Sequence, residues 1–160
     1  MLNLAHAEAD LGDYVAAVEH YSQAASLYDR IGSCTEVLRA QWGMADVLVQ
    51  LSNIPEGIDG LRRAAAEMLA LGMTNDHAKV MLDLAGKLYA LGELEELPAL
   101  CADLVGVFTE AKMPENARMA LAYLEAAVRE GAVSQPLIES VAEYIERENY
   151  GAPYAPPLSN

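Results

Sequence analysis

The residues that could carry out chemistry in this chain of 160 residues are few and widely spaced. His6 and Asp10 are the best placed, because residues four positions apart share one face of a helix, as a metal-binding or acid–base pair requires. Two ligands make a poor metal site, and no third ligand is evident in the sequence. An ordinary polar helix face is the favoured interpretation, and we predict no bound metal ion and no cofactor.

The remaining polar clusters also lack a catalytic pattern. The sequence contains no phosphate-binding glycine-rich loop, no H-E-x-x-H motif, no nucleophile elbow and no zinc-type cysteine spacing. Glu93, Glu95 and Glu96 stand where a helix is expected to begin, and carboxylates there stabilise the helix dipole. Calcium binding would need a longer loop rich in oxygen ligands. We expect His20 at the surface and no enzyme activity.

The charge balance narrows the class of partner. The chain has 24 acidic and 10 basic residues, a formal net charge of −14. Because this charge repels phosphate groups, we expect no nucleic-acid binding by this segment. The charge favours a basic peptide or protein partner, although a solvated acidic surface that keeps the chain in solution is the simpler explanation.

The cysteines and the hydropathy indicate the compartment. Cys34 and Cys101 are too few for a disulfide framework, which favours a reducing environment, and Cys101 falls at an apolar helix position typical of the core. The N-terminus has no signal-peptide pattern, and no segment reaches the roughly 20 apolar residues that cross a bilayer. We predict a cytoplasmic protein that does not interact with membranes.

The helices that position the candidate residues can be predicted from the hydrophobic periodicity of the chain. Apolar residues recur at intervals of three and four, and no segment alternates with a period of two, so the fold is predicted to be all-α. Gly32 should end a helix, while Ser33 or Thr35, Thr74 to Asp76, and Ser134 should cap others. Pro98 requires its helix to begin late or to kink. The expected helices span about 1–11, 14–31, 36–51, 55–71, 76–91, an unfixed start to 111, 115–130, and from the Ser134 cap to near 150.

A period of 40 residues relates these helices to one another. Gly12, Ser52 and Gly92 are 40 positions apart, and each follows a leucine. A fixed period in this range is typical of stacked helix pairs. We therefore expect about four antiparallel pairs in one repeat domain over residues 1–150.

The first pair resembles a tetratricopeptide repeat (TPR). The matching residues are Leu4-Ala5, the turn Gly12-Asp13-Tyr14, and then Ala17, Tyr21 and Ala24. The small residue recurs as Ala45 and Ala85, as close helix crossings require. The resemblance covers residues 1–111 and fades in the fourth pair. Gly57 and Leu97 replace Ala17 in later copies, and Leu61 and Cys101 replace Tyr21.

The resemblance implies a right-handed α–α superhelix, or solenoid, whose first helices line a concave groove that binds a protein or peptide. The function expected on this basis is a non-catalytic binding scaffold within a larger regulatory protein of bacterial type. The alternative is a peptide-sensing regulatory domain of a transcriptional or signalling regulator. The residues that fall on the implied groove are Asn3, His6, Asp10, Arg39, Trp42, Asp46, Gln50, Lys79, Asp83, Tyr89, Arg118, Glu125 and Arg129.

Two features of this residue set have two interpretations each. Arg39, Lys79 and Arg118 recur at near-regular spacing, which would suit a carboxylate-bearing peptide, but ordinary surface charge is favoured because the carboxylate-clamp pattern of some TPRs is not reproduced. Trp42 would either contact the ligand or belong to the core.

The two ends of the chain carry separate expectations. The first repeat begins about three residues short, so part of its apolar face should be uncovered, which suggests a C-terminal piece of a larger protein or a homodimer paired through this end. Residues 151–160 contain three prolines and should form an extended, polyproline-like tail that is docked on this chain or on a neighbour.

Overall fold

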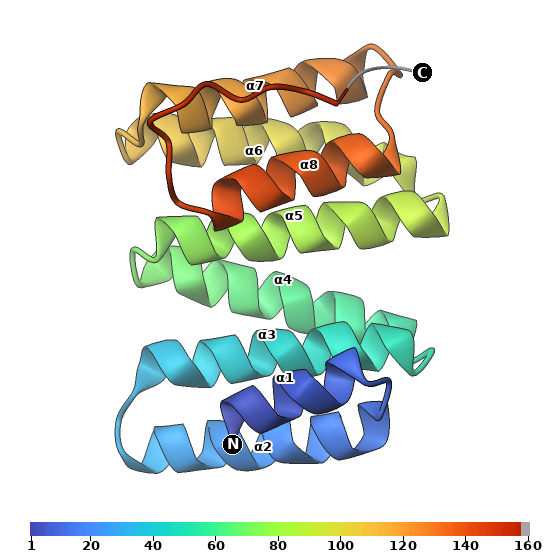
Figure 1. Cartoon of the computed structure of the whole chain (residues 1–160), viewed down its shortest axis with the longest axis vertical. Helices are drawn as coiled ribbons and strands as arrows, with labels where there is room; N and C mark the ends of the chain where they lie inside the picture. The colour runs from blue at the N-terminus through green and yellow to red at the C-terminus, as the bar shows by residue number, and fades with distance from the viewer. Residues whose placement is uncertain (158–160) are drawn as a thin grey trace. The chain divides into compact units, whose positions relative to one another are not determined.

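Residues 1–157 are the part of the chain that the computed structural model describes, and within them every regular element is a helix (Figure 1). The all-α prediction is therefore confirmed. The chain divides after Gly72 into two compact units, unit 1 over residues 1–72 and unit 2 from residue 73 onward. Unit 1 contains α1 (Leu2–Asp10), α2 (Tyr14–Arg30), α3 (Cys34–Gln50) and α4 (Ile54–Ala70). Unit 2 contains α5 (Thr74–Leu91), the 3-10 turn η1 (Leu94–Glu96), α6 (Leu97–Glu110), α7 (Glu115–Arg129) and α8 (Gln135–Glu146).

The 40-residue period corresponds to a repeated turn. Gly12, Ser52 and Gly92 all follow the end of a helix and all have positive φ, at 81°, 65° and 77°. Glycine adopts this conformation without steric cost, whereas Ser52 does so against the usual preference of L residues. The three copies of the turn therefore share one backbone conformation even where the sequence departs from glycine.

The helix boundaries follow most of the predicted signals. Ser134 caps α8, since its hydroxyl accepts a hydrogen bond from the amide of Leu137 at 3.4 Å. Gly32 ends α2 with a φ of 75°, and Pro98 lies in the first turn of α6, which begins late instead of kinking.

Two predicted boundaries were wrong. Helix α5 begins at Thr74 after Met73, so the polar run from Thr74 to Asp76 lies within its first turn and does not precede the helix as a cap. Helix α8 ends at Glu146, short of Tyr150, because Glu148 takes a positive φ of 50° and turns the chain back.

The core of unit 1 is formed by small residues at the helix crossings. Ala5, Ala17 and Ala45 are buried, and the buried Tyr21 packs with Ala5, Ala17 and Val47. At Gly57, helix α4 lies close to the backbone of α3. A Cβ atom there would lie 2.8 Å from the carbonyl oxygen of Ala45 and 2.9 Å from the amide nitrogen of Val49.

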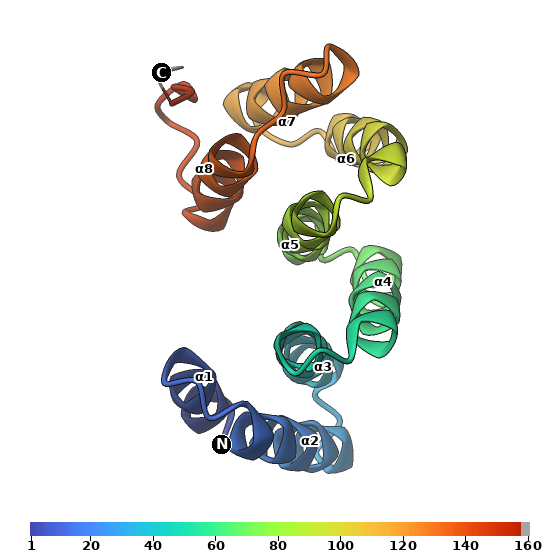
Figure 2. The ribbon, with the colours of Figure 1, turned by 90° about the vertical axis from the view of Figure 1, so that its right-hand side faces the viewer.

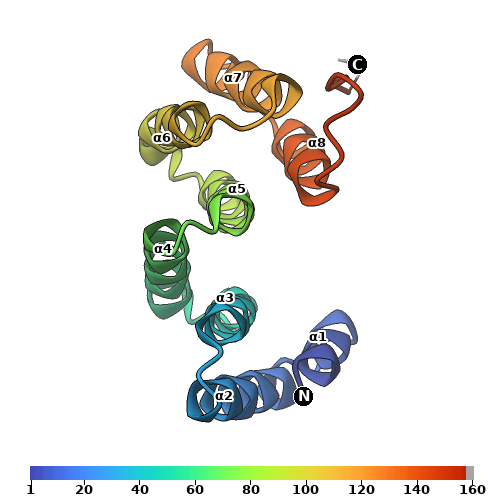
Figure 3. The same ribbon diagram turned by 90° about the vertical axis from the view of Figure 1, so that its left-hand side faces the viewer.

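Helix packing in unit 2 differs from a simple succession of pairs. Leu97 and Cys101 are both buried on α6, at the repeat positions held by Gly57 and Leu61 in unit 1. Helix α5 contacts α8 more extensively than it contacts α6, and α8 also contacts α7 (Figures 2 and 3). The sequence predicts a fourth pair of α7 with α8, whereas the main partner of α8 in this unit is α5.

Several apolar side chains of the first pair are exposed, as expected from the short first repeat. Leu4, Leu11 and Val15 are 49%, 86% and 71% exposed. No helix within residues 1–157 combines the length and the apolar character that crossing a membrane would require.

Candidate functional site

Tyr21 is the residue around which the predicted site residues of unit 1 gather. Its ring lies against Gly43 of α3, where any side chain would overlap ring atoms. Its hydroxyl is hydrogen-bonded to Nδ1 of His6 on α1 at 2.7 Å, and the two rings meet edge to face with centroids 5.3 Å apart. Tyr21 of α2 therefore joins three helices, and its hydroxyl fixes the orientation of His6.

Two carboxylates act on the same hydroxyl. Burial, followed in size by the negative charges of Asp46 on α3 and Asp10 on α1, raises the pKa of Tyr21 to about 12. A negative charge raises this pKa only if it lies close to the phenol oxygen. The structure thus brings together three residues of the predicted set, His6, Asp10 and Asp46, from two different helices.

The neighbouring predicted residues extend this surface along both helices. Asn3 and Gln50 are exposed, one on α1 and one on α3, while Trp42 is half-buried, one turn from Asp46. This half-buried position fits both interpretations of Trp42. We call this surface the α1/α3 face, and it comprises Asn3, His6, Asp10, Trp42, Asp46 and Gln50.

His20, which the sequence places at the surface, is partly exposed and has a partner on α1. Its Nδ1 atom lies 2.6 Å from the Oε2 atom of Glu8 on α1. The Glu8–His20 contact and the His6–Tyr21 hydrogen bond together tie α1 to α2 through polar groups. This explains how a helix of only nine residues is held in place.

The predicted residues of unit 2 do not form one comparable cluster. Lys79 on α5 pairs with Glu148 beyond α8 at 2.5 Å, and Asp83 pairs with Lys87 on its own helix at 2.8 Å. Tyr89 is half-buried farther along α5. The residues on α7 are likewise engaged locally: Nε of Arg118 donates to the carbonyl of Met113 at 3.1 Å, and Glu125 lies 3.8 Å from Arg129.

Arg39, Lys79 and Arg118, the regularly spaced cations of the sequence, each have a partner within their own unit. Arg39 lies 2.7 Å from Glu36, Lys79 lies beside Glu148, and Arg118 donates to a backbone carbonyl. A carboxylate ligand would have to compete with these contacts. Their geometry favours the interpretation of ordinary surface charge.

The C-terminal tail makes the second notable site. Residues 151–157 are docked on unit 2, as predicted, whereas 158–160 lie outside the described residues. The ring of Tyr154 lies between Tyr123 of α7 and Tyr144 of α8, with centroid distances of 5.9 and 5.5 Å. Its hydroxyl donates to Oγ of Ser140 at 3.2 Å, and the hydroxyl of Tyr144 donates to the carbonyl of Ala152 at 2.6 Å.

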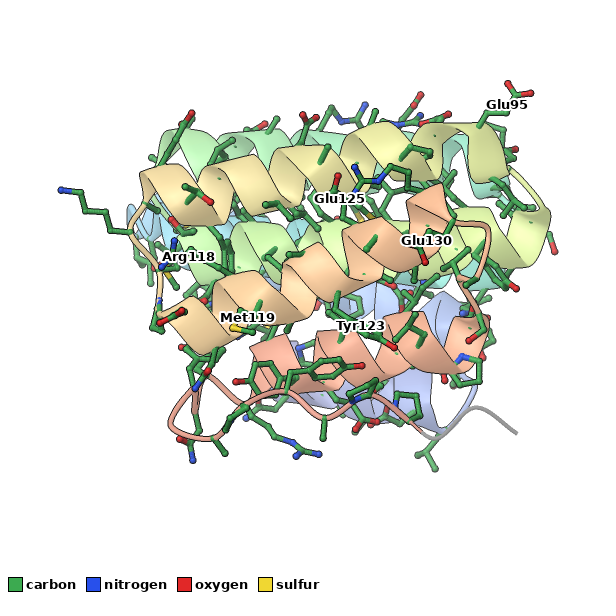
Figure 4. The ribbon with its side chains drawn as sticks, turned by 90° about the horizontal axis from the view of Figure 1, so that it is seen from above. Glu95, Arg118, Met119, Tyr123, Glu125 and Glu130 are labelled. Atoms are coloured by element: carbon green, nitrogen blue, oxygen red, sulfur yellow. The ribbon has the colours of Figure 1, made fainter. Side chains whose placement is uncertain are left out.

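A cavity of about 680 Å³ continues from this contact along α7 and α8. Pro156 and Pro157 line one side of it, and Tyr123, Glu130 and Pro136 line others. Tyr123 and Glu130 lie along α7 in Figure 4. We call Tyr123, Ser140, Tyr144 and this cavity the tail site.

Comparisons with protein-family models, with curated proteins and with solved structures gave no match for this chain. Within the described residues, no group of three or more histidine, cysteine or acidic side chains could hold a metal ion.

The sequence reasoning missed Gly43 and the tyrosines of the tail site. Gly43 lies inside a helix and does not end it, and the requirement for glycine at this position follows from its contact with the ring of Tyr21. For the tail site a signal was present, because four of the eight tyrosines, Tyr123, Tyr144, Tyr150 and Tyr154, fall within the C-terminal quarter of the chain beside its prolines. Their convergence became apparent only in three dimensions.

Proposed function

We propose that this chain is a non-catalytic, TPR-like scaffold that binds a positively charged peptide segment on the α1/α3 face. The observation that carries the proposal is the pair of carboxylates of Asp10 and Asp46, which come from two helices and both act on the Tyr21 hydroxyl. The 40-residue period and the repeated left-handed turn support the TPR-like superhelix that is part of the proposal.

The charges on the two helices favour a cationic ligand. Helix α1 contains no lysine or arginine, and α3 contains only Arg39, which lies beside Glu36. A lysine or arginine side chain of a peptide would therefore meet carboxylates on this face. The half-buried indole of Trp42 adds an aromatic surface on which a cation can stack, worth about 0.5–1 kcal/mol at exposed sites.

The cysteines support a reducing compartment as part of this proposal. Cys34 is exposed and Cys101 is buried, and both are free thiols. Burial, with a smaller effect of Glu125, raises the pKa of Cys101 to about 11, so its thiol stays protonated and unreactive at neutral pH. These properties fit a cytoplasmic scaffold.

The test measures the affinity of a fluorescent eight-residue peptide with alternating lysines by anisotropy, with a glutamine-for-lysine peptide as reference. We expect the chain to bind the lysine peptide, and Asp10→Asn with Asp46→Asn to weaken binding about tenfold, since rim charges of this kind each contribute about 0.5–1 kcal/mol. Added salt should weaken binding further.

The matched control removes the same charge elsewhere in unit 1. Asp29→Asn with Asp59→Asn changes two exposed carboxylates outside the α1/α3 face. We expect this variant to retain most of the affinity. Equal losses in both double variants would show general charge attraction and would reject a site on this face.

A further inference from the structure

The tail of unit 2 returns along the helix that precedes it. The positive φ of Glu148 turns the chain after α8. The Tyr150 hydroxyl donates to Oδ1 of Asn75 at 2.9 Å, and Nδ2 of Asn116 donates to the Tyr150 carbonyl at 2.8 Å. The start of the tail is thus anchored to α5 and α7 of its own chain.

Beyond this anchor, both the side chain and the backbone of the tail are recognised. Tyr154 lies between two aromatic rings, and its hydroxyl reaches Ser140. The Tyr144 hydroxyl donates to the carbonyl of Ala152, the residue before Pro153. Burial raises the pKa of Tyr144, and burial with a smaller opposing effect of Ser140 raises that of Tyr154, so both hydroxyls remain hydrogen-bond donors at neutral pH.

The bound segment has the character of a proline-rich ligand. Pro153 and Pro156 form a P-x-x-P spacing, and Pro157 follows. Proline fixes φ and holds the residue before it extended, so such a segment loses little conformational entropy when it binds. Aromatic-lined grooves that recognise P-x-x-P peptides exploit this property.

Residues 151–157 do not cover the whole of the tail site. Tyr123 remains 47% exposed although it contacts Tyr154, and the cavity lined by Pro156 and Pro157 also reaches Glu130 and Pro136. The contacts that hold Tyr154 are ring packing and single hydrogen bonds, which a separate peptide forms equally well.

From these contacts we infer that the tail site binds an extended P-x-x-P segment of a partner protein, with a tyrosine after the first proline, and that the chain's own tail is a tethered competitor for it. This inference goes beyond the proposed function, because it concerns another surface and an uncharged ligand. A partner fits better than the tail of a second copy, since Tyr150 anchors each tail to its own unit.

The factor by which the tail weakens peptide binding follows from its effective concentration. A segment on a short tether has an effective concentration of about 1 mM. If the free peptide binds with a Kd of about 0.1 mM, the docked tail weakens its apparent affinity about tenfold. Releasing the tail should recover that factor.

The experiment uses the full chain and a fluorescent peptide with the sequence of residues 151–157. Tyr154→Ala releases the segment after Ala152 from the rings of Tyr123 and Tyr144, and we expect this variant to bind the peptide about tenfold more tightly than the wild type. Adding Tyr123→Ala to this variant should weaken its binding of the peptide about tenfold, because an aromatic contact with the ligand is lost. The matched control adds Met119→Ala, which changes an exposed residue one turn away on α7 and should leave the affinity of the released chain unchanged.

Three results would overturn the inference. One is equal peptide affinity for wild type and Tyr154→Ala, and another is an equal loss with Met119→Ala and Tyr123→Ala. The third is a dimer in light scattering that Tyr123→Ala dissolves, which would assign the site to the tail of a second copy. Helical circular dichroism of every variant shows whether a lost affinity reflects unfolding. A peptide with its tyrosine changed to alanine should bind about tenfold more weakly than the original peptide.

Discussion

The two units start from related helix pairs and pack them differently. In unit 1, Gly57 allows α4 to contact the backbone of α3, so consecutive helices pack closely. In unit 2 the corresponding position is the buried Leu97, α5 contacts α6 less, and α8 covers α5. A glycine at the helix crossing thus accompanies close packing of consecutive helices, and a leucine at the same repeat position accompanies looser packing, although the turns of both units share one backbone conformation.

The difference extends to the two candidate sites. In unit 1 the predicted residues of α1 and α3 gather around Tyr21 and present carboxylates. In unit 2 Lys79 of α5 is engaged by Glu148, and the notable site lies on α7 and α8, where it holds the tail. Unit 1 therefore has a charged face, whereas unit 2 has an aromatic site on α7 and α8.

The largest expected effect comes from Leu97, which is 1% exposed. Leu97→Ala should lower the free energy of unfolding by about 3 kcal/mol, because a buried leucine leaves a cavity when it is truncated. Urea unfolding followed by circular dichroism measures this change. A loss below about 1 kcal/mol would show that α6 does not depend on Leu97 for its packing.

An intermediate effect distinguishes one helical glycine of each unit. Gly57→Ala should destabilise by about 1–2 kcal/mol, because the new Cβ atom meets backbone atoms of α3 at under 3.0 Å. Gly86→Ala on α5 should instead stabilise by about 0.5–1 kcal/mol, since its Cβ atom would lie at 3.5 Å or more from Gln135 and Ile138.

Thermal melts of both glycine variants provide the measurement. If the two variants shift the melting temperature in the same direction, the proposed difference in helix approach is wrong.

A smaller effect on stability is expected from the alkaline titration of Tyr21 in unit 1. The ordinary pKa of tyrosine is 10, and that of Tyr21 is raised to about 12. A raised pKa means that the folded state holds the proton more tightly, so this contribution to stability is complete below pH 10 and is lost as pH rises to 12.

Tyr21→Phe should therefore make the free energy of unfolding fall less steeply between pH 10 and 12. It should also remove one late-titrating group from the tyrosinate absorbance curve. Tyr150→Phe is the matched variant in unit 2, where burial and then Glu148 raise the pKa to about 12. An unchanged slope in Tyr21→Phe would contradict the environment described for its hydroxyl.

Much of this architecture could be predicted from the sequence, because local signals decide helices and turns. The glycine and serine turns, the Ser134 cap and the late start beside Pro98 all depend on residues within a few positions. The partner of α8 could not be predicted, since its contact with α5 joins residues that lie far apart in the chain.

The candidate sites likewise combine features that the sequence predicts with features that depend on the three-dimensional fold. The resemblance to a TPR assigns His6, Asp10 and Asp46 to one groove, and the structure brings these three residues together around Tyr21. Their link through the Tyr21 hydroxyl was not found, since Tyr21 was expected only as a core aromatic and Gly43 carried no signal. The tyrosines of the tail site meet only because the chain turns at Glu148.

Trp42, the only tryptophan of the chain, lies on the α1/α3 face, so its fluorescence should report directly on the proposed binding of a cationic peptide. Titration of the lysine peptide should change Trp42 fluorescence saturably, with a midpoint equal to the Kd from anisotropy. In Asp10→Asn with Asp46→Asn the midpoint should move about tenfold higher. Binding that leaves Trp42 fluorescence unchanged, or a midpoint that the double variant does not move, would contradict the claim.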